Sequence, residues 1–280
     1  MNLALELHVT ATQRGAAKSL LQQHCDLEPE AIQACFDNGA VWIETGHKPF
    51  RIRDSKRELS RDQQIHLYCN ASTLQPCPYQ PTLVEDFTDF SIWNKPSGML
   101  SQGSKWGDHW ALYRWIEQHG WPDRKSYITH RLDRYTQGLM IVAHTADCNS
   151  ALHRMFENHQ VSKTYRAIVH GLIESSEEFE ISDAIQHKRA LTTIRVLEKD
   201  EQRCCTLIEA LPQSGRKHQI RIHLAGIGHP ILNDRQYGIA PHQGDLQLQA
   251  CALAFKHPHT QQALQIQLPQ TEKLSIAHDL

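Results

Sequence analysis

Apolar residues along this chain recur first at helical and then at strand spacing. Helical spacing is found in Ala16–Gln22 and Glu30–Phe36. Extended apolar segments follow at Ala40–Glu44 and Gln64–Cys69. We therefore expect the chain to begin with a small domain of two short helices followed by two strands.

Strand patterns outnumber helical ones in the rest of the chain. The expected strands are Phe90–Asn94, Leu139–Thr145, Lys163–His170, Leu191–Leu197, Cys204–Leu211, Leu246–Phe255 and Ala263–Leu268. The expected helices are His109–His119, Ala146–His159 and Gln219–Ala225. Because the strands follow one another in hairpin-like order rather than alternating with helices, we predict an α+β fold with a mixed, mostly antiparallel sheet.

A proline-rich stretch separates these two regions. Pro76, Pro78 and Pro81 lie among small polar residues with no hydrophobic period, which is typical of a linker. We expect a small domain over residues 1–69, a linker over 70–82 and a larger domain over 83–280. A chain of 280 residues is long enough for both to bury a core.

Charge is balanced overall but not locally. The chain has 29 basic and 31 acidic residues, a net charge of −2, so it has no bulk attraction for nucleic acid. One stretch has six basic residues against Asp54 and Glu58: Lys48, Arg51, Arg53, Lys56, Arg57 and Arg61. This stretch could be a solvated face or a contact for an anionic polymer.

Cysteine and histidine usage narrows the class of protein. The eight cysteines form no Cys-x-x-Cys pair, and the N-terminus lacks a basic stretch followed by a long apolar run, so we expect a reduced, cytoplasmic protein. No apolar run approaches the roughly 18 residues of a membrane span. The 19 histidines lack the spacing of a zinc site, so we expect no metal. A histidine-based metallohydrolase stays an alternative that metal analysis would test.

The run His130–Leu139, with the sequence HRLDRYTQGL, places one carboxylate between basic residues just before an apolar strand. Alone, it could be a surface turn in which Asp133 pairs with the neighbouring arginines. It resembles the HRLDxxTSG signature of the RluA-type pseudouridine synthases. Four further segments are similar to motifs of that family and stand in its order: Asn94–Met99 (N-K-P-x-G-x), Lys163–Gly171 (K-x-Y-x-A-x-V-x-G), Gly215–Leu224 (GRTHQIRVHL) and Gly228–Gly238 (GHPIxGDxxYG).

The resemblance implies an isomerase that converts uridine to pseudouridine in structured RNA without a cofactor. Asp133 matches the family's catalytic aspartate. It could attack the sugar, attack the base or support elimination to a glycal. Burial alone would protonate such a carboxylate, so an opposite charge is needed. The resemblance assigns that charge to Arg221, and it assigns to Tyr165 stacking on the target base and proton transfer at the sugar.

The same motifs suggest contacts to the substrate from His130, Arg131, Arg134, Lys163, Arg216, His218 and Gln219. As a hypothesis, Arg131 fills the space left by an extruded nucleotide and His130 shapes the loop. Lys95 and Gly98 are expected to form a scaffold. Lys217 replaces a threonine of the family pattern. Gln137, Gln249 and a short stretch between Gly171 and Leu191 also depart from it, and we expect these three to alter loop support or RNA choice rather than chemistry.

The first domain resembles, more weakly, the α-L RNA-binding module of ribosomal proteins. Phe36–Ile43 is similar to its strand entry, whereas Arg14–Lys18 and Leu59–Ile65 are degenerate versions of its other motifs. We expect a monomeric protein whose partner is rRNA or tRNA and that needs neither metal nor membrane. The rival is a non-catalytic protein that grips and remodels structured RNA. Only a synthase would lose its activity in Asp133→Ala.

Overall fold

The computed structural model describes residues 4–46, 48–175 and 177–276. Its internal contacts divide the chain into two compact units. Unit 1 comprises Met1–Pro78 and Gln102–Gly120, and unit 2 comprises Tyr79–Ser101 and Trp121–Leu280. Residues 102–120, which lie within the second domain expected from the sequence, are thus grouped with unit 1.

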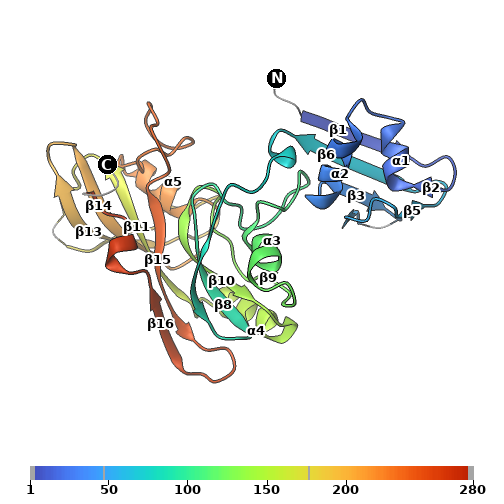
Figure 1. Ribbon diagram of the computed structural model, residues 1–280. Coiled ribbons are helices and arrows are strands. Elements are labelled where there is room, and N and C mark those ends of the chain that lie inside the picture. Colours follow the sequence, from blue (N-terminus) through green and yellow to red (C-terminus); the bar gives the residue numbers. More distant parts are fainter. Residues whose placement is uncertain (1–3, 47, 176, 277–280) are drawn as a thin grey trace. The chain divides into compact units, whose positions relative to one another are not determined.

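Unit 1 is a small antiparallel sheet covered by two helices (Figure 1). The strand order is β1 (Ala4–Thr10), β6 (Gln64–Asn70), β3 (Val41–Glu44) and β4 (Phe50–Ile52). Helices α1 (Ala17–Gln22) and α2 (Pro29–Asp37) bury Leu21, Ile32 and Phe36 against the sheet residues Ile43 and Leu67. Two short strands, β2 (Gly15–Ala16) and β5 (Glu58–Leu59), form a separate pair. The expected helices and strands are present, whereas β1, β2, β4 and β5 were not expected.

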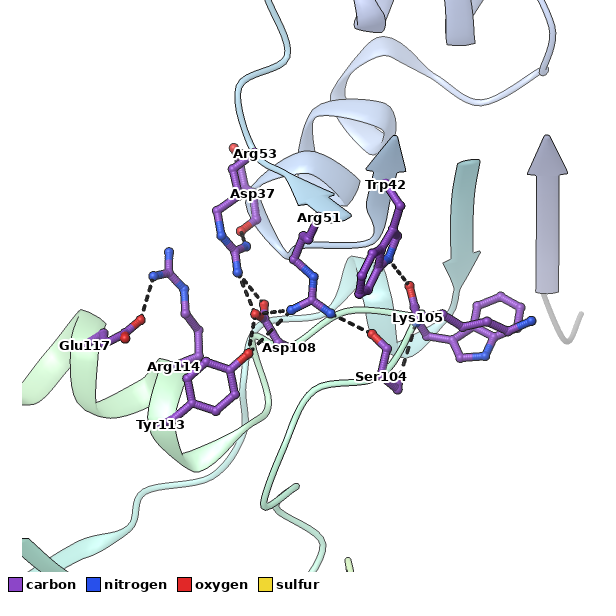
Figure 2. Close-up of polar contacts among 11 residues, drawn as sticks. Asp37, Trp42, Arg51, Arg53, Ser104, Lys105, Asp108, Tyr113, Arg114 and Glu117 are labelled. Carbon is purple, nitrogen blue, oxygen red and sulfur yellow. Dashed lines mark hydrogen bonds and ion pairs between the residues drawn. The ribbon is translucent and has the colours of Figure 1, made fainter. Parts of the chain in front are cut away.

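The segment Gln102–Gly120 of unit 1 contains α3 (Leu112–Trp115) and a π-helical turn, Ile116–Gly120. The sequence predicted a helix from His109, but α3 begins three residues later. His109 instead donates from Nε2 to the carbonyl oxygens of Ser72 and Gln75, both at 3.0 Å. Asp108 is held by Arg51 and Arg53 (Figure 2). These contacts hold residues 108–109 in a loop, so the helix starts only after them.

Unit 2 is built on a ten-stranded sheet with a few helices (Figure 1). The main path runs β12 (Phe179–Ile181), β13 (Thr192–Asp200), β14 (Cys205–Pro212), β11 (Ser162–His170), β15 (Leu248–Lys256), β10 (Gln137–Ala143), β8 (Phe90–Lys95) and β7 (Thr82–Asp86). Strand β16 (Ala263–Gln267) pairs with β15, and β9 (Tyr127–Ile128) pairs with β10. Only β10 and β15 pair in parallel among the described strands. The predicted α+β class with a mostly antiparallel sheet is confirmed.

Two helices cover different halves of this sheet. Helix α4 (Ala146–Glu157) buries Leu152 in a cluster with Phe90 and Ile141. Helix α5 (Gln219–Gly226) buries Leu224 in a second cluster with Val169 and Ile208. Because α5 is anchored by this apolar face, its polar residues are held in fixed positions on the other side.

No helix in the described ranges is long and apolar enough to cross a membrane.

The parallel pair β10–β15 depends on Gly138. This residue lies opposite Ala250 in the register and has φ +112°, a conformation that favours glycine. A Cβ at position 138 would collide with the backbone of Ala250. The glycine therefore allows the two strands to meet, and β10 starts directly after the motif loop at residues 130–136.

Candidate active site

Asp133 lies in the loop that leads into β10, and the backbone of this loop is fixed. Ser101 Oγ donates to the carbonyl oxygen of Leu132 at 2.6 Å and accepts from the Leu132 amide at 3.0 Å. The amide of Thr136 donates to the carbonyl oxygen of Asp133 at 3.1 Å. The carboxylate is therefore carried by a rigid turn, which limits the entropy lost when a substrate binds.

Arg221 places a guanidinium between two carboxylates. From α5, its Nη1 donates to Asp133 Oδ2 at 3.2 Å. Its Nε and Nη2 donate to Asp234 Oδ2 and Oδ1, both at 2.7 Å, a bidentate pair. The Asp234 side chain is 0% exposed and that of Asp133 is 27% exposed. Asp234 thus anchors the arginine, while Asp133 has one bond to it and a face open to a ligand.

The electrostatics of this cluster keep its charges in place. Burial opposes the charge on Arg221, but the Asp234 and Asp133 carboxylates outweigh burial and raise the pKa of the guanidinium. Burial also opposes the charge on Asp234, but the hydrogen bonds from Arg221 and from the amides of Gln236 and Tyr237 lower the pKa of this carboxyl. The arginine is consequently a fixed cation beside Asp133.

His218 approaches the second oxygen of Asp133. It precedes α5 with a left-handed φ of 57°, and its Nε2 lies 3.7 Å from Asp133 Oδ1. Its Nδ1 is 3.0 Å from the hydroxyl of Tyr237. Burial lowers the pKa of His218 although Asp133 opposes this. In the neutral ring, the carboxylate favours the proton on Nε2, so that Tyr237 donates to Nδ1.

Lys95 connects the loop of Asp133 to the Asn94–Met99 motif through hydrogen bonds. Its buried ammonium donates to the carbonyl oxygens of Met99 at 2.9 Å, Pro96 at 3.1 Å and Arg134 at 3.1 Å. Gly98, with φ +82°, donates its amide to the carbonyl oxygen of Arg134 at 3.0 Å. Burial lowers the pKa of Lys95 to about 7, opposed by the charge of Asp133. These contacts are the scaffold that the sequence led us to expect from Lys95 and Gly98.

Tyr165 and Lys163 enter the region from strand β11. The register between β11 and β15 shifts at Thr164/Tyr165, which changes the direction of the side chains that follow. Burial and the charge of Asp133 both raise the pKa of Tyr165, so its phenol is neutral. Burial lowers the pKa of Lys163. An added Cβ at Gly215 would meet Lys163 Nζ at 3.8 Å, which places this amine beside the motif loop before α5.

Two residues that the sequence suggested as substrate contacts are bonded within the protein. Gln219 Oε1 accepts from Ser214 and Arg216, and its Nε2 donates to the Leu191 carbonyl oxygen and the Thr192 hydroxyl. The amide of Gln219 is therefore satisfied on both sides and supports the turn before α5.

The half-buried ring of His130 likewise supports the protein. Its Nε2 accepts from the Ile141 amide at 3.0 Å, and it stacks on Phe156. Burial lowers the pKa of this ring to about 3, so it is neutral and shapes the loop.

The remaining suggested residues lie at the surface. Arg131, Arg134 and Arg216 are exposed, and Arg216 donates to the carbonyl oxygen of Arg189 at 3.2 Å. The sequence had not assigned a partner to Asp234 or a role to Tyr237, although both stand in the Gly228–Gly238 motif. In the described part of the chain, no three His, Cys, Asp or Glu side chains gather as a metal site.

This chain is similar in sequence to known RNA-modifying enzymes. Residues 89–226 match the family described as RNA pseudouridylate synthase. The tRNA pseudouridine synthase C of Vibrio cholerae is 37% identical over 211 residues, which cover 62% of this chain and 84% of the relative. The dual-specificity RNA pseudouridine synthase RluA of Vibrio parahaemolyticus is 32% identical over 202 residues, covering 65% of this chain and 79% of that protein.

Solved structures share the fold of about two thirds of this chain. The human RNA pseudouridylate synthase domain containing 1 superposes with a TM-score of 0.59 at 23% identity, covering 68% of this chain and 83% of that structure. Fold and sequence together define an RNA-modifying isomerase. The chain belongs to the RluA-type RNA pseudouridine synthases, as its five motifs predicted.

Proposed function

We propose that this enzyme isomerises a uridine of a structured RNA, tRNA in the first place, with Asp133 as the catalytic carboxylate. The observation that carries the proposal is the asymmetry around Arg221. Asp234 takes two of its donors and is fully buried, whereas Asp133 takes one and is 27% exposed. A carboxylate that is held by a guanidinium and is still partly exposed is suited to act on a ligand.

The reaction breaks the bond between ribose and uracil nitrogen 1 and joins the sugar to carbon 5 of the base. Attack on the sugar, attack on the base and elimination to a glycal all need an ionised carboxylate, which Arg221 supports electrostatically. The neutral phenol of Tyr165 is able to stack on the base and to pass a proton. The assignment of Asp133 as the catalytic carboxylate therefore does not depend on which of these three reaction routes is followed.

The names of the relatives guide the choice of RNA. Relatives from Vibrio cholerae, Yersinia pestis and Pasteurella multocida are called tRNA pseudouridine synthase C. A further relative is called a dual-specificity RNA pseudouridine synthase. We therefore place tRNA first among substrates to test and rRNA second.

The test uses tRNA and rRNA labelled with tritium at carbon 5 of uracil, because that hydrogen is lost when carbon 5 bonds to the sugar. The wild-type enzyme should release tritium, and Asp133→Asn should reduce the rate by at least about 10³-fold. Asp123→Asn, in an exposed loop, is the matched control and should act as wild type. An Asp133→Asn enzyme with more than a tenth of the wild-type rate would overturn the assignment.

The same experiment separates the enzyme from an RNA-remodelling protein. Asp133→Asn should bind RNA with near wild-type affinity while forming no pseudouridine. If wild-type protein remodels RNA and releases no tritium from either RNA class, the catalytic proposal fails.

We also propose that unit 1 contacts RNA phosphates through part of its basic stretch. Arg51 and Arg53 are committed to Asp108, which removes them from this role (Figure 2). The exposed members are Lys48, Lys56, Arg57 and Arg61. Each phosphate contact contributes roughly 0.7–0.9 log units of affinity per tenfold change in salt. Lys56→Gln with Arg57→Gln should lower this slope by one to two contacts, and an unchanged slope would exclude the pair.

A further inference from the structure

An aromatic ring stands exposed in the loop of the catalytic carboxylate. Tyr135 follows Asp133 by two residues, and 39% of its surface is exposed. Two guanidinium groups lie near its ring, with Arg134 Cζ at 5.4 Å and Arg235 Cζ at 5.7 Å from the centroid. Arg235 comes from the turn that begins with Asp234. The ring therefore lies where the loops of the two carboxylates bound to Arg221 meet.

The backbone under this ring is held by several bonds. Ser97 Oγ donates to the carbonyl oxygen of Tyr135 at 3.1 Å. Lys95 Nζ and the Gly98 amide donate to the carbonyl oxygen of Arg134, and Arg134 Nε donates to the Gly98 carbonyl oxygen at 3.1 Å. A tyrosine on a fixed backbone offers a flat surface at little entropic cost on binding.

The composition of this cluster indicates its ligand. A tyrosine ring with two guanidinium groups over it matches the surfaces on which proteins stack unpaired bases, since aromatic rings and guanidinium planes both stack on the π-face of a base. Exposed basic side chains next to an exposed ring attract that phosphate without sequence preference.

Resting on the proposed function, we infer that Tyr135, with Arg134 and Arg235, forms a stacking platform for an unpaired nucleotide next to the target uridine. Two residues of chain span at most about 7 Å. A base on Tyr135 is therefore a close neighbour of the nucleotide at Asp133, and the target base itself remains with Tyr165. The platform selects RNA in which the neighbour of the target is free to unstack.

The experiment compares Tyr135→Ala and Tyr135→Phe on a tRNA transcript that the wild-type enzyme modifies. Tyr135→Ala should weaken RNA binding by about 5- to 150-fold, as expected for loss of one stacked base, and should raise KM more than it lowers kcat. Tyr135→Phe keeps the π-face and should restore binding to within about threefold. Leu197→Ala, an exposed apolar residue on β13, is the matched control and should bind as wild type.

A second arm identifies the stacked base. The same transcript is made with an abasic site on either side of the modified uridine. One of these two RNAs should bind the wild-type enzyme more weakly and should abolish the difference between wild type and Tyr135→Ala. Arg235→Gln should reduce the salt slope by about one phosphate contact.

The outcomes distinguish this inference from the function on which it rests. Wild-type turnover together with unchanged affinity in Tyr135→Ala overturns the platform alone. A loss of affinity that persists with both abasic RNAs, or that is equally large in Tyr135→Phe, also overturns it. A wild-type enzyme that forms no pseudouridine in any tRNA or rRNA overturns the proposed function and the platform with it.

Discussion

The two units contain clusters made of the same groups in opposite proportions. In unit 1, the carboxylate of Asp108 is 3% exposed, contacts both Arg51 and Arg53, and accepts from the Tyr113 hydroxyl at 2.6 Å (Figure 2). In unit 2, a single guanidinium, Arg221, faces two carboxylates. The aspartate between two guanidiniums is buried, whereas only one of the two carboxylates on Arg221 is fully buried and the other is 27% exposed. The contrast is between a carboxylate that is closed to ligands and one that is partly exposed.

The sharpest test of this contrast exchanges Asp234 for asparagine. The change leaves the buried Arg221 without its bidentate partner, so we expect the free energy of unfolding to fall by about 3–5 kcal/mol. Asp133→Asn should cost only about 1–2 kcal/mol, because Arg221 keeps Asp234. Urea unfolding of both variants measures the difference. Equal losses would contradict the view that Asp234, and not Asp133, anchors the arginine.

Asp108→Asn probes the saturated cluster of unit 1. Two guanidiniums would lose their counter-charge, but the Arg53 side chain is 30% exposed and can be hydrated, so we expect a loss of about 2–3 kcal/mol confined to the unfolding of unit 1. Hydrogen exchange, resolved by peptide, measures it. Glu58→Gln, whose ion pair with Arg14 is exposed, should stay within about 1 kcal/mol. Faster exchange in the strands of unit 2 as well would exclude a local role.

A variant of Lys95 tests how this buried group contributes to stability beside the loop of Asp133. Its pKa in the folded protein is lowered to about 7, so above that pH the unfolded chain binds more protons than the folded one. Stability should therefore rise between pH 7 and pH 9 by about 2 kcal/mol more in wild type than in Lys95→Met. Urea unfolding over this pH range is the measurement. Parallel curves of stability against pH for the two proteins would show that deprotonation of Lys95 does not cause the rise.

The smallest effect is expected from Tyr237→Phe. The variant keeps the ring near Arg221 but removes the hydroxyl that donates to His218, one hydrogen bond of about 1 kcal/mol. We expect kcat/KM to fall by roughly fivefold with little change in stability. His218→Gln should produce a similar loss, and the double variant should lose no more than the larger single one. Fully additive losses would show that the two residues act independently.

Most of unit 2 could be predicted because its signals are local. The alternation in Lys163–His170 and the apolar run at Leu139 correspond to β11 and β10 within a few residues. Strand β7 was not predicted because its residues are largely exposed and show no alternation of apolar and polar side chains. In unit 1, β4 was not predicted because it has only three residues. The parallel pairing of Gly138 with Ala250 joins segments far apart in sequence, so no local pattern indicates it.

The sequence suggested which residues to expect in the candidate site but not most of the bonds among them. The resemblance of the motifs implied that Arg221 pairs with Asp133, and the structure has these two side chains in contact at 3.2 Å. The second carboxylate on Arg221 depends on how the chain turns between Arg221 and Asp234, which the sequence does not encode in any simple period. The same holds for Arg235 beside Tyr135, since these residues share no element.

The segment Gln102–Gly120 determines how the protein could be divided into its two units. Unit 1 is connected to unit 2 at three peptide bonds, because the chain leaves unit 2 after Ser101 and returns at Trp121. A truncated protein that starts at Tyr79 would keep Asp108 and lose both arginines that neutralise it. Expressing unit 2 by itself therefore requires excision of residues 102–120 together with the first 78, and expressing unit 1 by itself requires both pieces.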